Sequence, residues 1–190
     1  DVMADLQGRL APSQAVLSIV AGATVENISR GLDHPVVIRG MPNTPAQVGQ
    51  GMSVWTTAPE VSDEQRDVTR ELLKTLGEEI YVSDEKYLDM ATALSASGPA
   101  YVFLFIEALI DAGVYLGMPR DMARKLVLQT VLGSTRLVQD TGRHPADLKD
   151  MVTSPGGTTE YAIKTFAAAG LDSIVTDALR AARDRSVELA

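Results

Sequence analysis

Three short segments combine hydroxyl groups, glycine and proline in patterns that suit ligand binding. The clearest is Ser154-Pro155-Gly156-Gly157-Thr158-Thr159, which lies between two helix-like stretches. Adjacent glycines permit backbone conformations in which successive N–H groups point at one anion, and the start of the following helix adds its positive dipole end. Hydroxyl groups of Ser154 and Thr159 flank that point, so the segment suits a carboxylate. The alternative is an ordinary helix, capped by Ser or Thr after a tight turn.

The second segment is Met41-Pro42-Asn43-Thr44-Pro45, directly after an expected strand. Each proline fixes its own φ angle and restricts the residue before it, so Asn43 and Thr44 lie on a stiff loop. Ligands of open α/β sheets bind beyond the carboxyl ends of strands, which is where this loop falls. The residues leave open whether Asn43 faces a ligand or bonds its own backbone in a rigid turn.

The third segment, Ser95-Ala96-Ser97-Gly98-Pro99, precedes a long apolar helix. Pro99 fits the first helical turn, where its missing N–H is not needed. Ser97 and Gly98 leave room for a ligand at the helix start, although a serine cap would account for the segment by itself.

Composition narrows the classes of function. The chain has no cysteine, which excludes disulfides and thiolate chemistry and fits a cytoplasmic protein. Its net charge of −8 argues against a nucleic-acid surface. His34 and His144 are far apart and each precedes a proline, so we expect no metal site. The longest apolar stretch is interrupted by Glu107 and Asp111 and falls short of the roughly 20 residues of a spanning helix, so no membrane association is expected.

The first part of the chain alternates strand and helix patterns. Strands are expected at residues 15–21, 35–40, 52–57 and 79–83. A helix capped by Thr24 follows the first strand, and another, opened by a Ser62–Gln65 capping box and ended by Gly77, precedes the last. This alternation predicts an α/β layer with at least partly parallel strands.

After Val82 only helical patterns follow, with breaks at Gly and Pro. The expected helices cover residues 84–94, 98–116, 120–141, 145–152, 158–169 and 173–189. We therefore expect an α/β domain at 1–82 and an all-helical domain at 83–190. The stretch 101–117 is apolar almost all round, so it should be buried on most faces. Either a partner subunit covers it in an interlocked homodimer, or the domain buries it by itself.

Together, in this order and spacing, the three segments resemble the pyrroline-5-carboxylate reductase family, and the likeness extends from residue 16 to residue 189. The resemblance implies reduction of the cyclic imine 1-pyrroline-5-carboxylate to L-proline with NADPH or NADH. It also implies a Rossmann-type domain followed by a helical dimerisation domain, assembled as a homodimer or higher oligomer. The sequence contains no G-x-G-x-x-G fingerprint, and it opens without Met. We therefore expect it to be the C-terminal part of such an enzyme, with an incomplete Rossmann-type domain.

The resemblance also assigns roles to residues. It places Ala21 and Gly22, after Val20, along the cofactor, and Met41, Pro42, Asn43 and Thr44 near the nicotinamide. It gives the substrate carboxylate to Ser154, Gly157, Thr158 and Thr159, and places Thr92 and Ser97 near the imine. Two alternatives remain: a dimerisation module without catalysis, and another imine or 2-hydroxy-acid reductase of similar plan. The second ranks behind because the three segments lack the Lys, Asp or His that such enzymes usually place at the reacting centre.

Overall fold

The computed structural model describes residues 2–189, which fall into two compact units. The sheet unit comprises the chain up to Pro99 together with the stretch from Ala178 onward, and the helical unit is Ala100–Asp177. The boundary between residues 82 and 83, expected from the change of sequence pattern, stays a prediction. Division by packing instead places the following helix and the end of the chain with the sheet.

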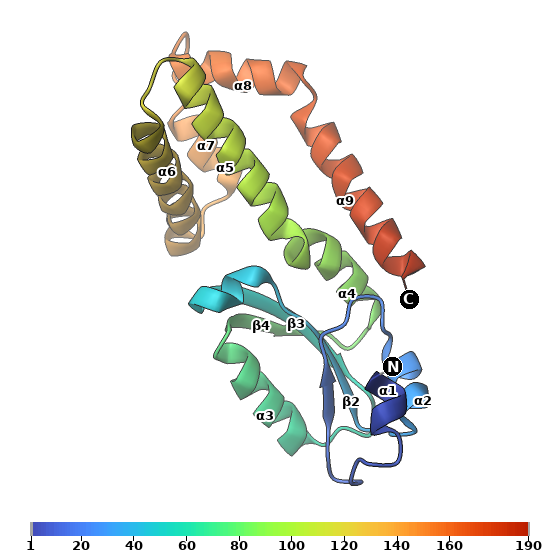
Figure 1. The fold of residues 1–190 in the computed structure, drawn as a ribbon. Coiled ribbons are helices and arrows are strands. Elements are labelled where there is room, and N and C mark those ends of the chain that lie inside the picture. Colours follow the sequence, from blue (N-terminus) through green and yellow to red (C-terminus); the bar gives the residue numbers. More distant parts are fainter. Residues whose placement is uncertain (1, 190) are drawn as a thin grey trace. The chain divides into compact units, whose positions relative to one another are not determined.

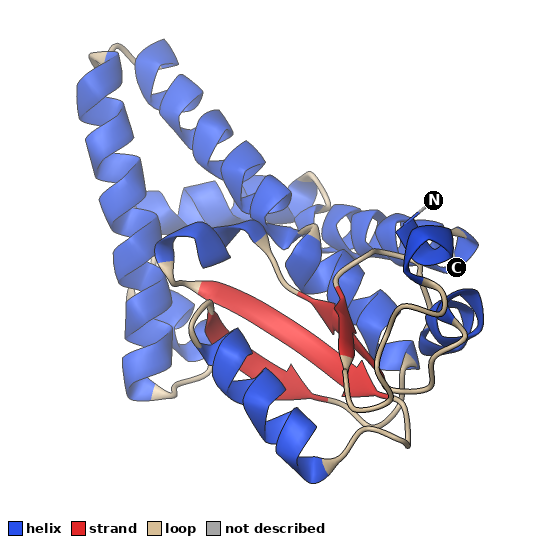
Figure 2. Cartoon of the chain, turned by 60° about the horizontal axis from the view of Figure 1, so that its bottom comes forward, coloured by secondary structure: helices blue, strands red, loops and turns tan. Residues whose placement is uncertain are grey.

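Four strands form one sheet in the sheet unit (Figures 1 and 2). They are β1 (Val16–Ser18), β2 (Val37–Met41), β3 (Gly51–Thr57) and β4 (Gly77–Tyr81), in that spatial order. The pairs β1–β2 and β3–β4 are parallel, whereas β2 and β3 are antiparallel. The four expected strands and their partly parallel pairing are thus confirmed. Because of the antiparallel pair, the carboxyl ends of β1 and β2 lie at one edge of the sheet and those of β3 and β4 at the opposite edge.

The two faces of the sheet carry different side chains. Trp55 is fully buried, donates its indole N–H to Glu79 at 2.6 Å and lies beneath the guanidinium of Arg70 from α3 (Asp63–Lys74). Side chains alternate along a strand, so Thr56 and its pairing partner Arg39 face the other way. The core groups Trp55 with buried aliphatic residues of α2, β2 and α3. The sheet unit therefore has an apolar core of its own, and Arg39 is a buried charge on the strand face opposite Trp55.

The short helices of this unit begin where their capping residues predict. They are α1 (Val2–Leu6), α2 (Val25–Leu32) and α3, and the 3₁₀ helix η1 spans Thr44–Val48. Thr24 accepts a hydrogen bond from Asn27 N, and Ser62 and Gln65 form the expected reciprocal capping box. We expected Gly77 to end α3, and this expectation is wrong. The helix closes at Thr75, and Gly77 instead opens β4 at a φ of 139°.

The expected break at Ser97-Gly98-Pro99 narrows to a single bend at Ser97, and the next helix begins at Gly98 as expected. Helix α4 (Lys86–Ala91) continues through a π-helical turn, η2 (Thr92–Ala96), into α5 (Gly98–Tyr115), so that one helix runs from Lys86 to Tyr115. Contrary to the sequence-based expectation, the joined helix is long and apolar enough to cross a bilayer by length and composition alone. Core helices of other proteins pass the same test, so the observation is weak evidence for a membrane span.

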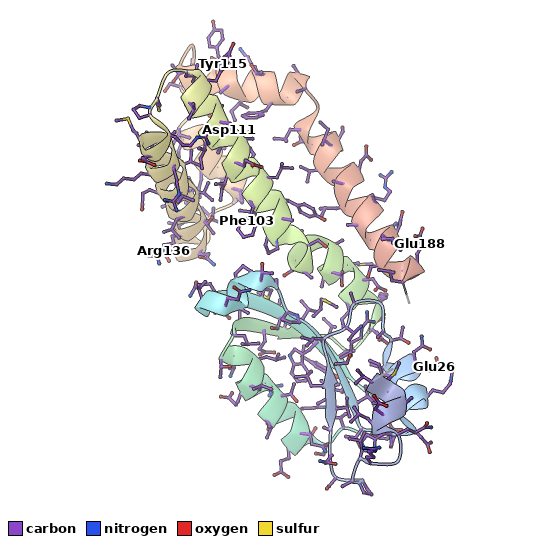
Figure 3. The ribbon with its side chains drawn as sticks, in the orientation of Figure 1. Glu26, Phe103, Asp111, Tyr115, Arg136 and Glu188 are labelled. Carbon is purple, nitrogen blue, oxygen red and sulfur yellow. The ribbon has the colours of Figure 1, made fainter. Side chains whose placement is uncertain are left out.

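The helical unit holds most of α5, followed by α6 (Arg120–Thr141), α7 (Pro145–Met151), α8 (Thr158–Ala168) and the first part of α9 (Leu171–Glu188). The expected helices are confirmed to within a few residues. The single chain does not bury the apolar helix α5. No residue of α5 is buried, and Phe103 and Tyr115 project from it at 60% and 91% exposure (Figure 3). The alternative in which the domain buries this helix by itself is therefore wrong.

Candidate functional site

Two candidate segments leave the sheet at the same edge. Ser18, at the end of β1, pairs with Arg39 in the parallel strand β2. The chain continues from Ser18 to Ala21 and Gly22 on one strand, and from Arg39 to Met41 and Pro42 on the other. The sheet thus brings the two groups of candidate cofactor residues together at adjacent carboxyl ends. Ile19 and Val20 are exposed there and offer an apolar surface to a flat ring.

Gly22 is constrained by both its backbone and its neighbours. Its φ of 77° lies in the left-handed region, and a Cβ at this position would meet the carbonyl oxygen of Leu189 at 2.6 Å. The end of α9 therefore rests directly on the turn that follows β1. A side chain at residue 22 would displace either the turn or the end of the helix.

The side-chain amide of Asn43 holds its loop in place. Its carbonyl oxygen accepts a hydrogen bond from Met52 N at 2.9 Å, across the β2–β3 connection. Its NH₂ group contacts the carbonyl oxygen and the hydroxyl of Ser95 at 3.2 and 3.3 Å. The Asn43 side chain is therefore bonded to the protein, although to Met52 and Ser95 rather than to the backbone of its own turn. A ligand at this loop would meet its backbone and its exposed Thr44.

Pro99 explains why Ser95 is available to Asn43. In an α-helix the N–H of residue 99 would bond the carbonyl of residue 95, but proline has no N–H to donate. The Asn43 amide contacts that free carbonyl instead. The π turn just before Pro99 is a common adjustment where a helix must accommodate such a break. Consequently the second and third candidate segments are joined by direct contacts. Ser97 lies between the π turn and α5, where its N–H donates to the carbonyl oxygen of Thr92.

Thr92 opens the π turn, and its hydroxyl has a defined orientation. Its Oγ1 donates to the carbonyl oxygen of Leu88 at 2.7 Å, and its own carbonyl accepts from Ser97 N at 2.9 Å. A carbonyl oxygen can only accept, so the single hydroxyl proton of Thr92 is already used. In this arrangement the lone pairs of the Thr92 hydroxyl are what it offers to a ligand.

The loop from Ser154 to Thr159 belongs to the helical unit. Gly156 adopts a φ of 72°, and Gly157 N donates to the carbonyl oxygen of Ser154 at 3.0 Å in a tight turn. Gly157 is the N-cap of α8, and the cap makes no side-chain hydrogen bond. The Ser/Thr-capped alternative is therefore wrong, and the N–H groups of Thr158 and Thr159 in the first turn have no side-chain cap.

The loop already binds one carboxylate, which belongs to the protein itself. Glu160 Oε2 accepts from Gly156 N at 2.5 Å, and Glu160 Oε1 pairs with Lys164 Nζ at 2.7 Å. The hydrogen bond from Lys164, followed by the one from Gly156, holds the pKa of the Glu160 carboxyl below its ordinary value. The motifs in the sequence did not identify Glu160 as a functional residue. An acid at the third helical position nevertheless commonly reaches back to the preceding backbone.

The structure therefore joins two of the three candidate segments in the sheet unit and holds the third in the helical unit. Within residues 2–189, no group of three or more His, Cys, Asp and Glu side chains is arranged to hold a metal ion. Arg39 was also missed. A lone charge inside the otherwise apolar strand β2 was the available signal, since a charged residue is rarely fully buried without a partner.

Comparison with known proteins decides the family. The family model for pyrroline-5-carboxylate reductase dimerisation matches residues 85–189. Over 188 residues the chain is 44% identical to the pyrroline-5-carboxylate reductase of Synechocystis sp., covering 99% of this chain and 70% of that protein. It belongs to the pyrroline-5-carboxylate reductase family. The enzyme of that name from Glycine max is 42% identical over 189 residues, which cover 100% of this chain and 69% of the relative.

Solved members of the pyrroline-5-carboxylate reductase family share the fold. The crystal structure of Plasmodium falciparum pyrroline carboxylate reductase with NADP bound matches with a TM-score of 0.94 at 32% identity, covering 99% of this chain and 75% of that one. The enzyme from Coxiella burnetii matches with a TM-score of 0.90 at 36% identity, covering 100% and 71% of the two chains. The predicted combination of a Rossmann-type α/β region and a helical dimerisation region is thereby confirmed.

Proposed function

We propose that the protein reduces 1-pyrroline-5-carboxylate to L-proline with NADPH or NADH, the final step of proline synthesis. The observation that carries this proposal is identity above 40% to pyrroline-5-carboxylate reductases along essentially the whole chain. The contact between the Asn43 loop and the π turn supports it, because it fixes two of the assigned segments together.

The sheet edge fits the nicotinamide end of the cofactor. Ala21 and Gly22 form a small-residue turn beside exposed Ile19 and Val20, and the Met41–Thr44 loop leaves the adjacent strand. We assign these two segments to cofactor binding, with Asn43 acting by holding its loop. When bound, the nicotinamide supplies the hydride.

Thr92 serves as a hydrogen-bond acceptor in this proposal. Because its proton is donated to Leu88, its lone pairs suit the N–H of a protonated cyclic iminium. Such a bond stabilises the electrophilic form of the substrate and orients its ring. With the iminium already protonated, hydride transfer completes the amine without a further proton donor. Ser97, on the same π turn, is assigned to the surroundings of the imine.

The substrate carboxylate is assigned to the loop of the helical unit. Ser154, Gly157, Thr158 and Thr159 supply backbone N–H and hydroxyl donors at the positive end of α8. The Gly156 contact with Glu160 supports this assignment, because it demonstrates that a carboxylate fits against the backbone of this loop.

We further propose that the protein is a cytoplasmic homodimer, or a higher oligomer built from dimers. The family match over residues 85–189 is to a dimerisation region, and the apolar side chains of α5 are exposed in the single chain. A partner subunit that covers them also accounts for the length and apolarity of the Lys86–Tyr115 helix.

Turnover tests the proposal. NADPH oxidation is measured with pyrroline-5-carboxylate, using both the 190-residue chain and the complete protein. Turnover by the chain alone excludes an inert dimerisation module. A complete protein that leaves pyrroline-5-carboxylate unreduced, but reduces another cyclic imine, would support the other reductase class.

Two pairs of variants test the residue roles. Thr92→Val should lower kcat/KM roughly tenfold to a hundredfold, because hydrogen bonds to charged groups contribute about 1.5–3 kcal/mol, whereas Thr92→Ser should retain most activity. A Thr92→Val variant with the kcat/KM of the wild type would contradict the acceptor role. Thr159→Ala should raise KM for the substrate, whereas Thr165→Ala in the same helix should not.

A further inference from the structure

We infer that Arg39 is a positioning residue that fixes the cofactor edge of the sheet relative to the helix that carries Thr92. The inference rests on the proposed function for the identity of the positioned groups. Arg39 lies in the middle of β2 and is 1% exposed. Its Nη1 donates to Glu85 Oε1 at 2.8 Å, and its Nη2 lies 3.6 Å from Asp89 Oδ1.

Each acidic partner of Arg39 also holds a second segment of the sheet unit. Glu85 Oε1 accepts a further hydrogen bond from Val25 N at 2.8 Å, at the start of α2. Asp89 Oδ1 accepts from the hydroxyl of Ser186 at 2.9 Å, near the end of α9. One guanidinium thus connects β2, the start of α2, α4 and the end of α9 through two carboxylates.

The connected segments are those that carry the assigned residues. Met41 follows Arg39 by two residues, and Gly22 precedes Val25 by three. Thr92 follows Asp89 by three, one turn further along the helix. Ser186 is close to Leu189, whose backbone lies against Gly22. The ion cluster therefore sets the spacing between the turn after β1, the loop after β2 and the hydroxyl of Thr92.

Packing by itself does not account for this cluster. The neighbouring β2 residues Val37 and Ile38 are buried aliphatic side chains, and such residues often stabilise a fold as well as a buried ion pair does. Within residues 2–189, the Nε and Nη2 atoms of Arg39 are buried without a hydrogen-bond partner. A group that leaves two buried nitrogens without a hydrogen bond is a poor choice for stability, but its planar fork can orient Glu85 through a hydrogen bond and Asp89 through an ion pair.

The test compares Arg39→Met with the triple variant Arg39→Met, Glu85→Gln, Asp89→Asn in the complete enzyme. The triple variant removes all three charges, so no carboxylate is left unpaired, and it keeps acceptors for Val25 N and Ser186. Arg70→Met is the matched control, since Arg70 pairs with Asp67 at 2.6 Å in the same unit but touches none of the assigned segments. Circular dichroism and thermal unfolding establish that each variant is folded.

We expect the triple variant to fold normally and to lose kcat roughly tenfold to a hundredfold, with KM for the substrate little changed, because small misplacements of reacting groups have effects of that size. Arg39→Lys should lie between it and the wild type, since a point charge cannot orient both acids. In NMR spectra of the unliganded protein the methyl signal of Thr92 should move in the triple variant and stay in place in Arg70→Met.

A triple variant with wild-type kcat and an unmoved Thr92 methyl signal would overturn the inference. The NMR measurement needs no turnover, so it decides the positioning role even if the complete protein fails to reduce pyrroline-5-carboxylate. In that case the proposed function fails, and the role of Arg39 is judged separately.

Discussion

The two units of this protein differ in whether the single chain buries their apolar side chains. In the sheet unit, Trp55 is completely buried, and the residues of α2, β2 and α3 close a core around it. In the helical unit, α5 and α8 have no buried residue in the single chain, and Phe103 is 60% exposed. The first unit is built to be stable by itself. The second has the surface of a structure that is completed by association.

The largest expected effect is the loss of dimerisation on substitution of Phe103. Phe103→Asp removes a large apolar side chain from the proposed dimer contact and buries a carboxylate in its place, at a combined cost of more than about 4 kcal/mol. We expect a protein that no longer dimerises, as measured by sedimentation at micromolar concentration. Val68→Asp is the matched control, because Val68 is 65% exposed on α3 of the sheet unit. If Phe103→Asp stayed dimeric, α5 would not be the contact.

Trp55 tests the other side of the contrast. Trp55→Ala should destabilise the sheet unit by about 3–5 kcal/mol, as large-to-small core substitutions do. Trp55→Phe should cost less, because it keeps a ring but leaves Glu79 without its indole donor. Urea unfolding followed by circular dichroism measures both variants. In the wild type, Trp55 is the only tryptophan and its fluorescence reports on the sheet unit. A fluorescence midpoint that rises with protein concentration would show that this unit also depends on association.

The smallest expected effect concerns the charges of Glu160 and Lys164, next to the Ser154–Thr159 loop. Lys164 and Gly156 N hold the pKa of Glu160 below its ordinary value, so their contacts are complete above the unfolded-state pKa and are lost as pH falls through the folded-state pKa. Lys164→Gln should return the pKa of Glu160 toward its ordinary value, as followed by NMR titration of the carboxyl carbon. The Gly156 amide signal should titrate together with it. A separate titration of that amide would mean that Glu160 does not hold the loop in solution.

Local patterns predicted much of this fold. Capping residues and periodicity located α2, α3, the four strands and the helices of the second unit, because these signals lie within a few residues of each other. The antiparallel pairing of β2 and β3 was not foreseen, since consecutive strands give no direction by themselves. The π turn was also missed. Pro99 was interpreted as the start of a helix, and its effect depends on Asn43, 52 residues away from the carbonyl that it frees.

For the candidate site, too, local patterns were predictable and long-range contacts were not. Hydroxyl and glycine residues in short segments marked where a ligand could bind, but long-range contacts decide what each side chain can do. The Thr92 hydroxyl donates its proton to the carbonyl oxygen of Leu88, and the Asn43 amide donates to Ser95. Arg39 gained its role from Glu85, 46 residues later in the chain. Partners at such separations leave no periodic pattern in a single sequence.

The contact between Gly22 and Leu189 affects the order in which the protein can fold. The sheet unit is discontinuous in sequence, and its last piece begins at Ala178. During synthesis, the strands can pair while the turn at Gly22 and the carboxylate of Asp89 still lack Leu189 and Ser186. Closing so long a segment is entropically slow compared with local pairing. The edge of the sheet at Gly22 should therefore be the last part of the sheet unit to mature, after the helical unit has left the ribosome.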